Sequence, residues 1–313
     1  MKILISDKMS DKVEDVLQSK QIDYDIKTGM SPEELKEVID QYDGILIRSA
    51  TKLTSDILAD CKNLKVIGRA GVGVDNVDLD QATKNKILVM NTPLGNLEAT
   101  AELSVGLMFS LMRNIHLAND STHQGKWEKP KFIGTELKGK TLGIVGYGNI
   151  GQRVAEICST IGMNIITNSK SASDEDLSKF KANKVSTEQL IKEADIVSIH
   201  TKLNDETKYM FNKETLSTMK PTSVIINCAR GGLINEVDLK DALNNEVIAG
   251  AAIDVYENEP ATDNVMFGAK NLLLTPHLGA SSKEAQSNVA IDVANQVADF
   301  LKDNKIVNNV NSF

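Results

Sequence analysis

Cysteine is scarce in this chain, and its three cysteines are widely separated. Cys61, Cys158 and Cys228 form no CxxC pair, and an odd number of thiols cannot all pair within one chain. This pattern argues against a disulfide framework and against a zinc site, and we expect no bound metal. It is typical of a reducing compartment, so we expect a cytoplasmic protein.

Long apolar runs are also missing. No stretch approaches the roughly 20 consecutive apolar residues that span a bilayer. Residues 1–17 (MKILISDKMSDKVEDVL) do not resemble a secretory signal, because their apolar run is short and Asp7 interrupts it. There is no repeat and no low-complexity tract. We therefore expect no membrane association.

Positive charge is in deficit, since the formal net charge is -8 at pH 7. Such a chain repels nucleic acid, so we expect no nucleic-acid partner. An anionic substrate needs a local cluster of cations, and arginine suits it best because its guanidinium forks onto carboxylate and phosphate. Codon bias toward lysine is the simpler explanation of why arginines are few. They are Arg48, Arg69, Arg113, Arg153 and Arg230.

Short apolar runs alternate with helix-period segments from one end of the chain to the other. This rhythm predicts an α/β fold with parallel sheets covered by helices. Ser31, Pro32 and Glu34 have the pattern of a helix start with a capping box. The predicted strands lie in KILIS, DYDIK, GILIRS, KVIGRAG, ILVMNTP, TLGIVG, NIITNS, DIVSIH, SVIINCA, VIAGAAIDV and NLLLTPH.

Two successive α/β units are expected in the one chain. A long apolar helix over residues 98–118 and a closing helix over residues 282–301 are the natural crossovers between them. We predict a substrate domain from residues 1–97 plus 283–313, and a dinucleotide-binding domain from residues 98–282.

A glycine motif follows the predicted strand TLGIVG. It enters the helical segment QRVAEICSTIG, and a second strand, NIITNS, comes next. A dinucleotide site needs this context: one glycine makes the tight turn, the second admits the pyrophosphate, and the third lets helix and strand pack closely. The alternative is a glycine-rich turn of the kind found in any α/β protein. The motif comprises Gly146, Tyr147, Gly148, Asn149, Ile150 and Gly151.

Three residues late in the chain fit hydride transfer from an alcohol. Each follows a predicted strand, where such sheets bind ligands. His277 suits the transfer of the hydroxyl proton, and a carboxylate such as Glu259 would orient the ring and favour its protonated form. Arg230 suits a substrate carboxylate. Taken alone, a histidine is more often structural.

The other histidines are weaker candidates for proton transfer. His116 is expected in a helix and His123 in a polar connector, whereas His200 ends a strand and is expected to border the cofactor.

Several motifs in order resemble the D-isomer-specific 2-hydroxyacid dehydrogenases over nearly the whole chain. The resemblance implies two Rossmann- or flavodoxin-like domains with a cleft between them and a homodimer built on the dinucleotide-binding domain. Arg230, Glu259 and His277 fall on the family's catalytic positions, in the family's order. The motifs are GYGNIG, CARGGLINEVDL, AAIDVYENEP and TPHLGASSKEAQ.

The N-terminal part resembles the branch of the family that acts on 3-phosphoglycerate. ILIRSATKLT, NLKVIGRAGVGVDNVDLDQATKNKI and VMNTPLGNLEATAELSVGLM carry this likeness. It implies that loop 69–73 offers backbone amides to the substrate carboxylate and that arginines handle the phosphate. The implied substrate residues are Arg48, Ser49, Arg69, Ala70, Gly71, Val72, Gly73 and Asn96. The chain as given ends at Phe313, so we expect no serine feedback through a further C-terminal domain.

The resemblance also implies a set of cofactor-binding residues beyond the glycine motif. The expected cofactor is NAD. NADP is an alternative because Ser169, flanked by Asn168 and Lys170, stands where an NAD site usually has an acidic residue. Ser169 bonding the ribose of NAD, with the lysines in solvent, is the simpler interpretation. The implied residues are Asn168, Ser169, Lys170, His200, Thr201, Lys202, Thr207, Cys228, Ala229, Asp254, Gly279 and Ala280.

Three other functions remain open at this point. A hydroxypyruvate or glyoxylate reductase would use the same machinery, although Arg48 and Arg69 favour a phosphorylated substrate. Formate dehydrogenases of the superfamily have glutamine where Glu259 stands. An NAD-sensing corepressor is a binding protein of the same fold, but this chain has no basic or proline-rich appendage.

Overall fold

A computed structural model describes all 313 residues, and the chain divides into two compact units. Unit 1 comprises Met1–Leu97 and Ala280–Phe313, and unit 2 comprises Glu98–Gly279. Residues 280–282 belong to unit 1 rather than to the dinucleotide-binding domain predicted for them, because they lead directly into the last helix, which packs on the sheet of unit 1. None of the helices combines the length and apolar character needed to cross a membrane.

Unit 1 is built on a five-stranded parallel sheet in the order β2-β1-β3-β4-β5. This is the flavodoxin-like order, in which ligands bind at the carboxyl ends of the strands. The strands are β1 (Lys2–Ile5), β2 (Asp23–Ile26), β3 (Gly44–Ile47), β4 (Val66–Arg69) and β5 (Leu88–Asn91).

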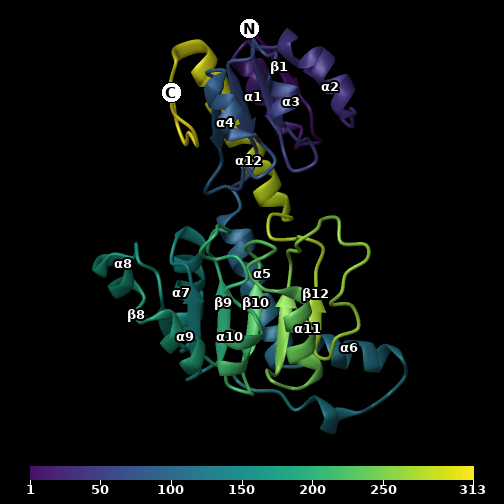
Figure 1. Ribbon diagram of the computed structural model, residues 1–313, viewed down its shortest axis with the longest axis vertical. Coiled ribbons are helices and arrows are strands. Elements are labelled where there is room, and N and C mark those ends of the chain that lie inside the picture. The colour runs from purple at the N-terminus through teal and green to yellow at the C-terminus, as the bar shows by residue number, and fades with distance from the viewer. The chain divides into compact units, whose positions relative to one another are not determined.

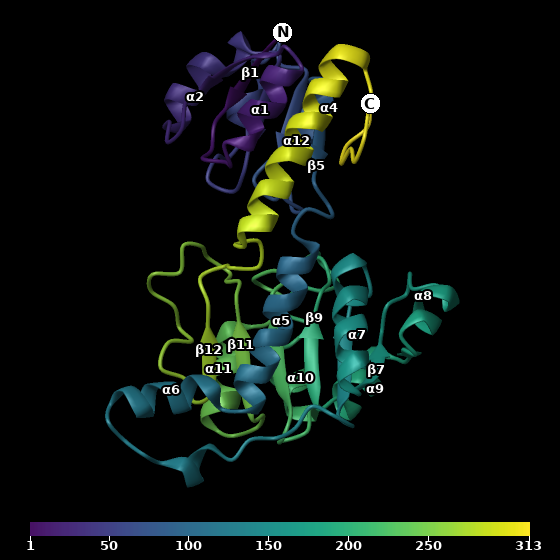
Figure 2. The ribbon, with the colours of Figure 1, turned by 180° about the vertical axis from the view of Figure 1, so that it is seen from behind.

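Helices cover both faces of this sheet. The last helix, α12 (Lys283–Asp303), packs beside α1 (Lys12–Ser19) on one face, as Figure 2 shows. The other face carries α2 (Pro32–Val38), α3 (Ser55–Leu58) and α4 (Leu79–Lys84), with the one-turn helix η1 (Ile39–Gln41). Alternate residues of a strand point to opposite faces of the sheet. Because helices cover both faces, the central strands are buried on both sides.

Unit 2 has a seven-stranded parallel sheet in the order β12-β11-β10-β9-β6-β7-β8 (Figure 1). Its centre has the dinucleotide-binding order, with the strand before the glycine motif in the middle. The two-residue strand β8 was not predicted. The strands are β6 (Thr141–Val145), β7 (Asn164–Thr167), β8 (Asn183–Lys184), β9 (Ile196–Ile199), β10 (Val224–Asn227), β11 (Gly250–Ile253) and β12 (Leu272–Leu274).

The helices of unit 2 form a layer on each face of its sheet. One core joins the sheet to α5 (Leu97–Met112) and α7 (Asn149–Ile161), with α8 (Asp174–Lys179) at its margin. The opposite core contains α9 (Thr187–Glu193), α10 (Lys213–Thr218) and α11 (Glu236–Asn244). The predicted α/β architecture with two parallel sheets is confirmed.

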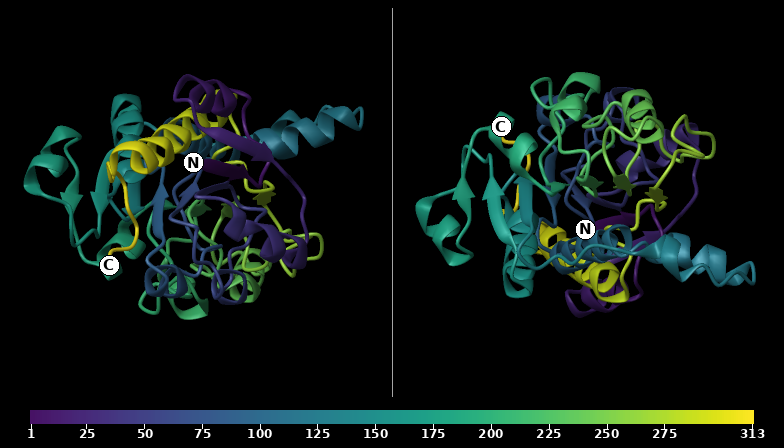
Figure 3. Two further views of the ribbon diagram at one scale, coloured as in Figure 1. Left: turned by 90° about the horizontal axis from the view of Figure 1, so that it is seen from above. Right: turned by 90° about the horizontal axis from the view of Figure 1, so that it is seen from below.

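The helix predicted over residues 98–118 is wrong in one respect, because it is two helices. Asn114 has a left-handed backbone (φ 53°), which ends α5, and α6 (Ile115–His123) starts in a new direction. Asparagine tolerates this conformation better than most residues. Figure 3 shows α6 projecting away from the rest of unit 2, and the one-turn helix η2 (Lys129–Phe132) follows it.

The C-terminal tail covers the edge of the sheet of unit 1. Asn309 forms an antiparallel bridge with Met90, and the amide of Val310 donates to the carbonyl of Val89 at 2.8 Å. The side chain of Asn311 accepts the Val89 amide at 2.8 Å. The open hydrogen-bonding groups of β5, which would otherwise attract another strand, are thereby partly satisfied.

Candidate active site

The glycine loop of unit 2 has the shape that a dinucleotide needs. Gly146 has φ +90°, and a Cβ atom there would lie 2.7 Å from the carbonyl oxygen of His200. A Cβ on Gly151 would lie 2.3 Å from the carbonyl oxygen of Gly146, so helix and strand meet without space for a side chain. A Cβ on Gly148 would meet nothing within 4 Å. The backbone is therefore open where a pyrophosphate approaches, at the start of α7.

The loop after β7 lies at the carboxyl edge of the same sheet. Asn168 donates from Nδ2 to the hydroxyl of Thr187 at 2.9 Å, and the hydroxyl of Ser169 lies 3.3 Å from that of Ser171. Ser169 is buried, whereas Lys170 is almost fully exposed. These are the residues predicted to face the adenosine ribose.

The segment after β9 contributes His200, Thr201, Lys202 and Thr207. The amide of His200 donates to the carbonyl of Val145 at 2.7 Å, which ties the segment to the strand before the glycine loop. Nε2 of His200 lies 2.8 Å from the hydroxyl of Ser198, and burial lowers the pKa of the imidazole to about 4. The ring is therefore neutral at pH 7. Thr207 donates its hydroxyl to the carbonyl of Lys202 at 2.7 Å, so it braces this segment.

Glu259 and His277 form a direct pair in unit 2. Nδ1 of His277 lies 2.7 Å from Oε2 of Glu259, and the other carboxylate oxygen accepts the amide of Tyr256 at 3.0 Å. Burial raises the pKa of the Glu259 carboxyl, but the hydrogen bonds from His277 and Tyr256 and the charges of His277 and Arg230 together lower it below its ordinary value of 4.5. Glu259 is thus ionised at neutral pH, so its carboxylate can only accept a hydrogen from Nδ1, and Nε2 is the ring nitrogen that this pair leaves available.

The backbone around His277 is constrained by Asp254. His277 has φ +55°, a left-handed conformation that residues other than glycine adopt uncommonly. Asp254 is fully buried, and its carboxylate accepts the amides of Leu278 at 2.7 Å and Gly279 at 2.9 Å. Its Oδ1 also accepts the hydroxyl of Thr275 at 2.5 Å. Asp254 was predicted to bind cofactor; here its oxygens hold the loop that carries His277.

Arg230 lies on a turn that follows β10. Asn227, which is buried, accepts the amide of Ala229 at 3.0 Å and donates to the carbonyl of Arg230 at 2.8 Å. A Cβ on Gly231 would lie 1.9 Å from the carbonyl oxygen of Tyr256, so the glycine lets this turn approach the segment of Glu259. Cys228 is buried, which raises the pKa of its thiol to about 12 and makes it a poor nucleophile.

Sequence reasoning missed Asn227 as a positioning residue. A usable signal existed, because asparagine at the end of a buried strand favours a turn closed by its own side chain. For Asp254 no local signal exists, since its partners lie more than 20 residues further along the chain.

In unit 1, Arg48 follows β3 and Arg69 ends the neighbouring β4, where Ile47 and Arg69 are register partners. Both arginines therefore lie at the carboxyl edge of adjacent strands. Asp7, which is buried, accepts the amide of Arg48 at 2.6 Å and the hydroxyl of Thr51 at 2.8 Å. This carboxylate, which was not predicted as a functional residue, fixes the loop that holds Arg48.

Not every backbone amide of the loop over residues 69–73 is available to a substrate, contrary to what the resemblance implied. The amide of Ala70 donates to the carbonyl of Ile47 at 2.9 Å, and that of Gly71 donates to the hydroxyl of Thr92 at 2.7 Å. The amides of Ala70 and Gly71 are thus used within the protein. The amides of Val72 and Gly73 have no hydrogen bond in the structure. Gly71 has φ +140°, and a Cβ there would overlap the guanidinium of Arg69.

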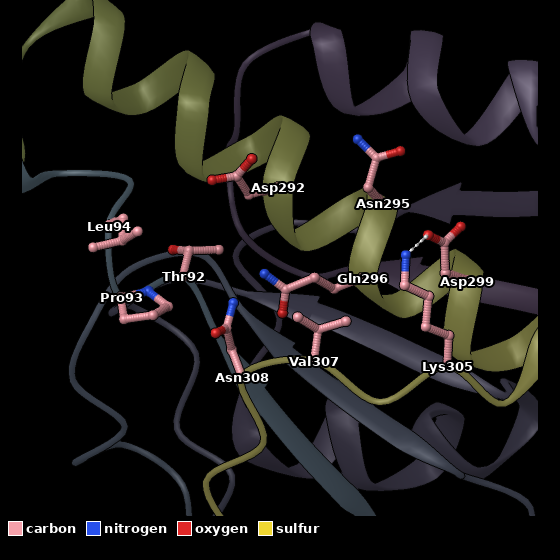
Figure 4. A pocket seen from close by; sticks show the side chains of 10 residues that line it. All are labelled: Thr92, Pro93, Leu94, Asp292, Asn295, Gln296, Asp299, Lys305, Val307 and Asn308. Carbon is pink, nitrogen blue, oxygen red and sulfur yellow. Dashed lines mark ion pairs between the residues drawn. The ribbon is translucent and has the colours of Figure 1, made fainter.

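The remaining predicted substrate residues are Ser49, which is exposed, and Asn96, whose buried Oδ1 has no hydrogen-bond partner. Figure 4 shows a different cavity of unit 1, of about 300 Å³. It is lined by α12, the C-terminal tail and the residues after β5, and by none of the predicted substrate residues. This cavity therefore belongs to the packing of the tail. It is lined by Thr92, Pro93, Leu94, Asp292, Asn295, Gln296, Asp299, Lys305, Val307 and Asn308.

The strand order, the open glycine loop and the histidine–carboxylate pair of unit 2 define a dinucleotide-binding protein of the Rossmann class. Residues 105–279 match the family model "D-isomer specific 2-hydroxyacid dehydrogenase, NAD binding domain". The chain belongs to the D-isomer specific 2-hydroxyacid dehydrogenase family, as its sequence resemblance predicted, and NAD is the cofactor for which this domain is named.

Curated relatives and a solved structure agree with this assignment. The chain is 44% identical over 301 residues to D-3-phosphoglycerate dehydrogenase of Synechocystis sp., covering 96% of this chain and 54% of the relative. It is 42% identical over 311 residues to the Bacillus subtilis enzyme of that name, covering 99% and 59%. An NAD-bound 3-phosphoglycerate dehydrogenase of Entamoeba histolytica superimposes with a TM-score of 0.84 at 29% identity, covering 100% and 99%. The chain thus spans little more than half the length of the curated relatives.

Proposed function

We propose that this protein is an NAD-dependent dehydrogenase of D-2-hydroxy acids and that its substrate is 3-phosphoglycerate, as in serine biosynthesis. The observation that carries the proposal is the pair of His277 and ionised Glu259 in the same unit as a glycine loop shaped for a dinucleotide. Two arginines at adjacent strand ends of unit 1 support a substrate with more than one negative charge. Relatives at 44% and 42% identity are named for this activity.

The proposed chemistry is the oxidation of the substrate's secondary alcohol, in which the carbon loses a hydride and its hydroxyl loses a proton. NAD, when bound, would supply the acceptor for this hydride. Nε2 of His277 takes the hydroxyl proton, and the carbonyl double bond forms as both leave. Glu259 stabilises the imidazolium so produced, and Arg230 holds a substrate carboxylate. In reduction, the protonated ring returns its proton to the carbonyl oxygen.

The test is a substrate panel in the presence of NAD or NADH. We expect turnover of 3-phosphoglycerate to exceed that of glyoxylate and hydroxypyruvate. Arg48→Ala should lower kcat/KM for 3-phosphoglycerate about 10- to 100-fold, the usual effect of losing a charged hydrogen bond. Glyoxylate has no phosphate to lose, so its kcat/KM should change little.

Arg113→Ala is the matched control, because Arg113 is exposed and lies in unit 2. Equal losses on both substrates would favour the small-acid reductase alternative, and an absence of turnover on every acid would favour an NAD-sensing binding protein.

We also propose a homodimer formed through unit 2. The segment that contains α6 projects from this unit (Figure 3) and exposes large apolar side chains. Trp127 is 87% and Ile133 82% exposed, and such surface usually marks a protein interface. Light scattering should give a molar mass twice that of one chain. Trp127→Asp should lower this molar mass toward that of a single chain. A monomeric wild type would reject this proposal.

All three cysteines are buried and unpaired, which supports a cytoplasmic location.

A further inference from the structure

The loop after β7 is unusual for a site that must favour NAD over NADP. In NAD sites, an acidic residue at the end of this strand bonds the ribose hydroxyls and repels a 2′-phosphate. Here Thr167 ends the strand, and residues 168–173 (NSKSAS) contain no carboxylate. The residue nearest to the expected position is Ser169, whose hydroxyl accepts as well as donates hydrogen bonds.

Hydrogen bonds hold this loop in place. The amide of Ser169 donates to the hydroxyl of Thr167 at 3.3 Å, and that hydroxyl donates to the carbonyl of Ile144 at 2.8 Å. Ser169 is only 8% exposed, and Asn168 is anchored on Thr187. The hydroxyls and the lysine that follow are therefore presented at the carboxyl edge of the sheet by a fixed backbone.

Two ammonium groups lie beside the loop. Lys184 is the register partner of Thr167 across β7 and β8, and its Nζ donates to the carbonyl of Lys170 at 3.2 Å. The second ammonium group belongs to Lys170, whose side chain is 95% exposed. Figure 1 shows β8 and α8 at this end of the seven-stranded sheet. The unpredicted strand β8 thus brings a cation to the ribose end of the dinucleotide site.

The carboxylate within ion-pair distance of these lysines is that of Glu206, which is exposed. Glu206 lies 3.9 Å from Lys170, a distance at which an exposed pair contributes little. Helix α8 begins with Asp174, Glu175 and Asp176, and the last two pair with Lys179 at 3.5 Å and 3.2 Å. Lys184 itself has no carboxylate within ion-pair distance.

We propose that the loop over residues 168–171 together with Lys184 forms a 2′-phosphate subsite, so that the protein binds NADP at least as well as NAD. Ser169 and Ser171 donate hydroxyl hydrogens to the phosphate, and Lys184 and Lys170 neutralise its charge. The inference rests on the dinucleotide role proposed above but concerns only the adenosine end of the cofactor.

Binding of adenosine fragments tests this subsite without any turnover. Calorimetry is run on the whole chain with 5′-AMP and with adenosine 2′,5′-bisphosphate, which differ only in the 2′-phosphate. We expect the bisphosphate to bind at least about threefold more tightly, with a difference that shrinks as salt screens the lysines. A bisphosphate that binds less tightly than this overturns the proposal, since Ser169 then serves only a ribose hydroxyl.

Variants assign the effect to named groups. Ser169→Asp should weaken the bisphosphate about 100-fold, because it places two negative groups together. Lys184→Gln and Lys170→Gln should each weaken it about two- to fivefold, and Glu206→Gln should strengthen it about twofold. Lys213→Gln, an exposed lysine at the start of α10, is the matched control and should change nothing. A bisphosphate affinity that survives Ser169→Asp would also overturn the proposal.

The 2′-phosphate subsite and the proposed dehydrogenase activity can be rejected independently. If the bisphosphate binds as expected but no hydroxy acid is oxidised with NAD or NADP, the subsite stands and the proposed function is rejected. If 3-phosphoglycerate is oxidised with NAD and the kcat/KM for NADP is more than about 100-fold lower, the function stands and the subsite is rejected.

Discussion

Nδ1 of His277 lies 2.7 Å from Oε2 of Glu259, although 17 residues separate them along the chain. The contact joins the segment after β11 to the segment after β12, two strands that are neighbours in the sheet of unit 2. A parallel sheet brings the carboxyl ends of consecutive strands to one edge, so this pair is a direct product of the topology. It leaves Nε2 as the ring atom available for proton transfer.

The first prediction concerns His277. His277→Ala should lower kcat by about 100- to 10,000-fold, the usual contribution of general acid–base catalysis. The Kd for NAD, measured by calorimetry, should stay within about twofold of wild type, because the glycine loop is untouched. His123→Ala, at an exposed helical histidine, is the control. A His277→Ala protein with wild-type kcat would remove this residue from the mechanism.

The second prediction concerns pH and Glu259. Its carboxyl has a lowered pKa, so its contribution to stability is fully present above its ordinary value of 4.5 and is lost as the pH falls through the lowered value. At neutral pH this charge lies against the ring of His277, since Oε2 of Glu259 is 2.7 Å from Nδ1. Glu259→Gln removes that charge, so the pH profile of reduction should shift toward lower pH. Steady-state rates of NADH oxidation at several pH values provide the measurement, and an unchanged profile would limit Glu259 to orienting the ring.

The third prediction concerns Asp254, which we treat as a positioning residue. Asp254→Asn removes the charge and one acceptor, so the amides of Leu278 and Gly279 lose part of their support. We expect kcat to fall about 100-fold, as misplacement of a catalytic group by about 1 Å can cause. Deuterium exchange over residues 275–281 should accelerate.

Thr275→Val gives the matched comparison, since it removes only the hydroxyl bond to Asp254. A loss of NAD affinity with unchanged exchange would assign Asp254 to cofactor binding instead.

The fourth prediction concerns acid stability and His200. Burial lowers the pKa of its imidazole from 6.5 to about 4, so the unfolded chain takes up a proton that the folded protein refuses. The stability associated with this group is present above pH 6.5 and falls as the pH drops toward 4. Between pH 7 and pH 5 the loss is at most about 2 kcal/mol. Urea unfolding of wild type and His200→Asn at both pH values tests this, and identical pH dependence in the two proteins would contradict it.

Several features were predictable from local sequence because their causes are local. The capping box of Ser31 and Glu34 forms as predicted, since its partners are three residues apart. The alternation of apolar runs and helical periods predicted both parallel sheets. The break at Asn114 was missed because apolar periodicity continues through it, and only the backbone conformation ends the helix.

By itself, the sequence determined the fold class, the glycine loop and the order of Arg230, Glu259 and His277. Each of these is written in residue type and spacing along the chain. Only the tertiary structure decided which groups are already used, as in the amides of Ala70 and Gly71 and the carboxylate of Asp254. It also placed Lys184 beside Thr167. The reason is physical: a hydrogen bond or charge contact depends on distance in space, and strand pairing sets that distance between residues far apart in the chain.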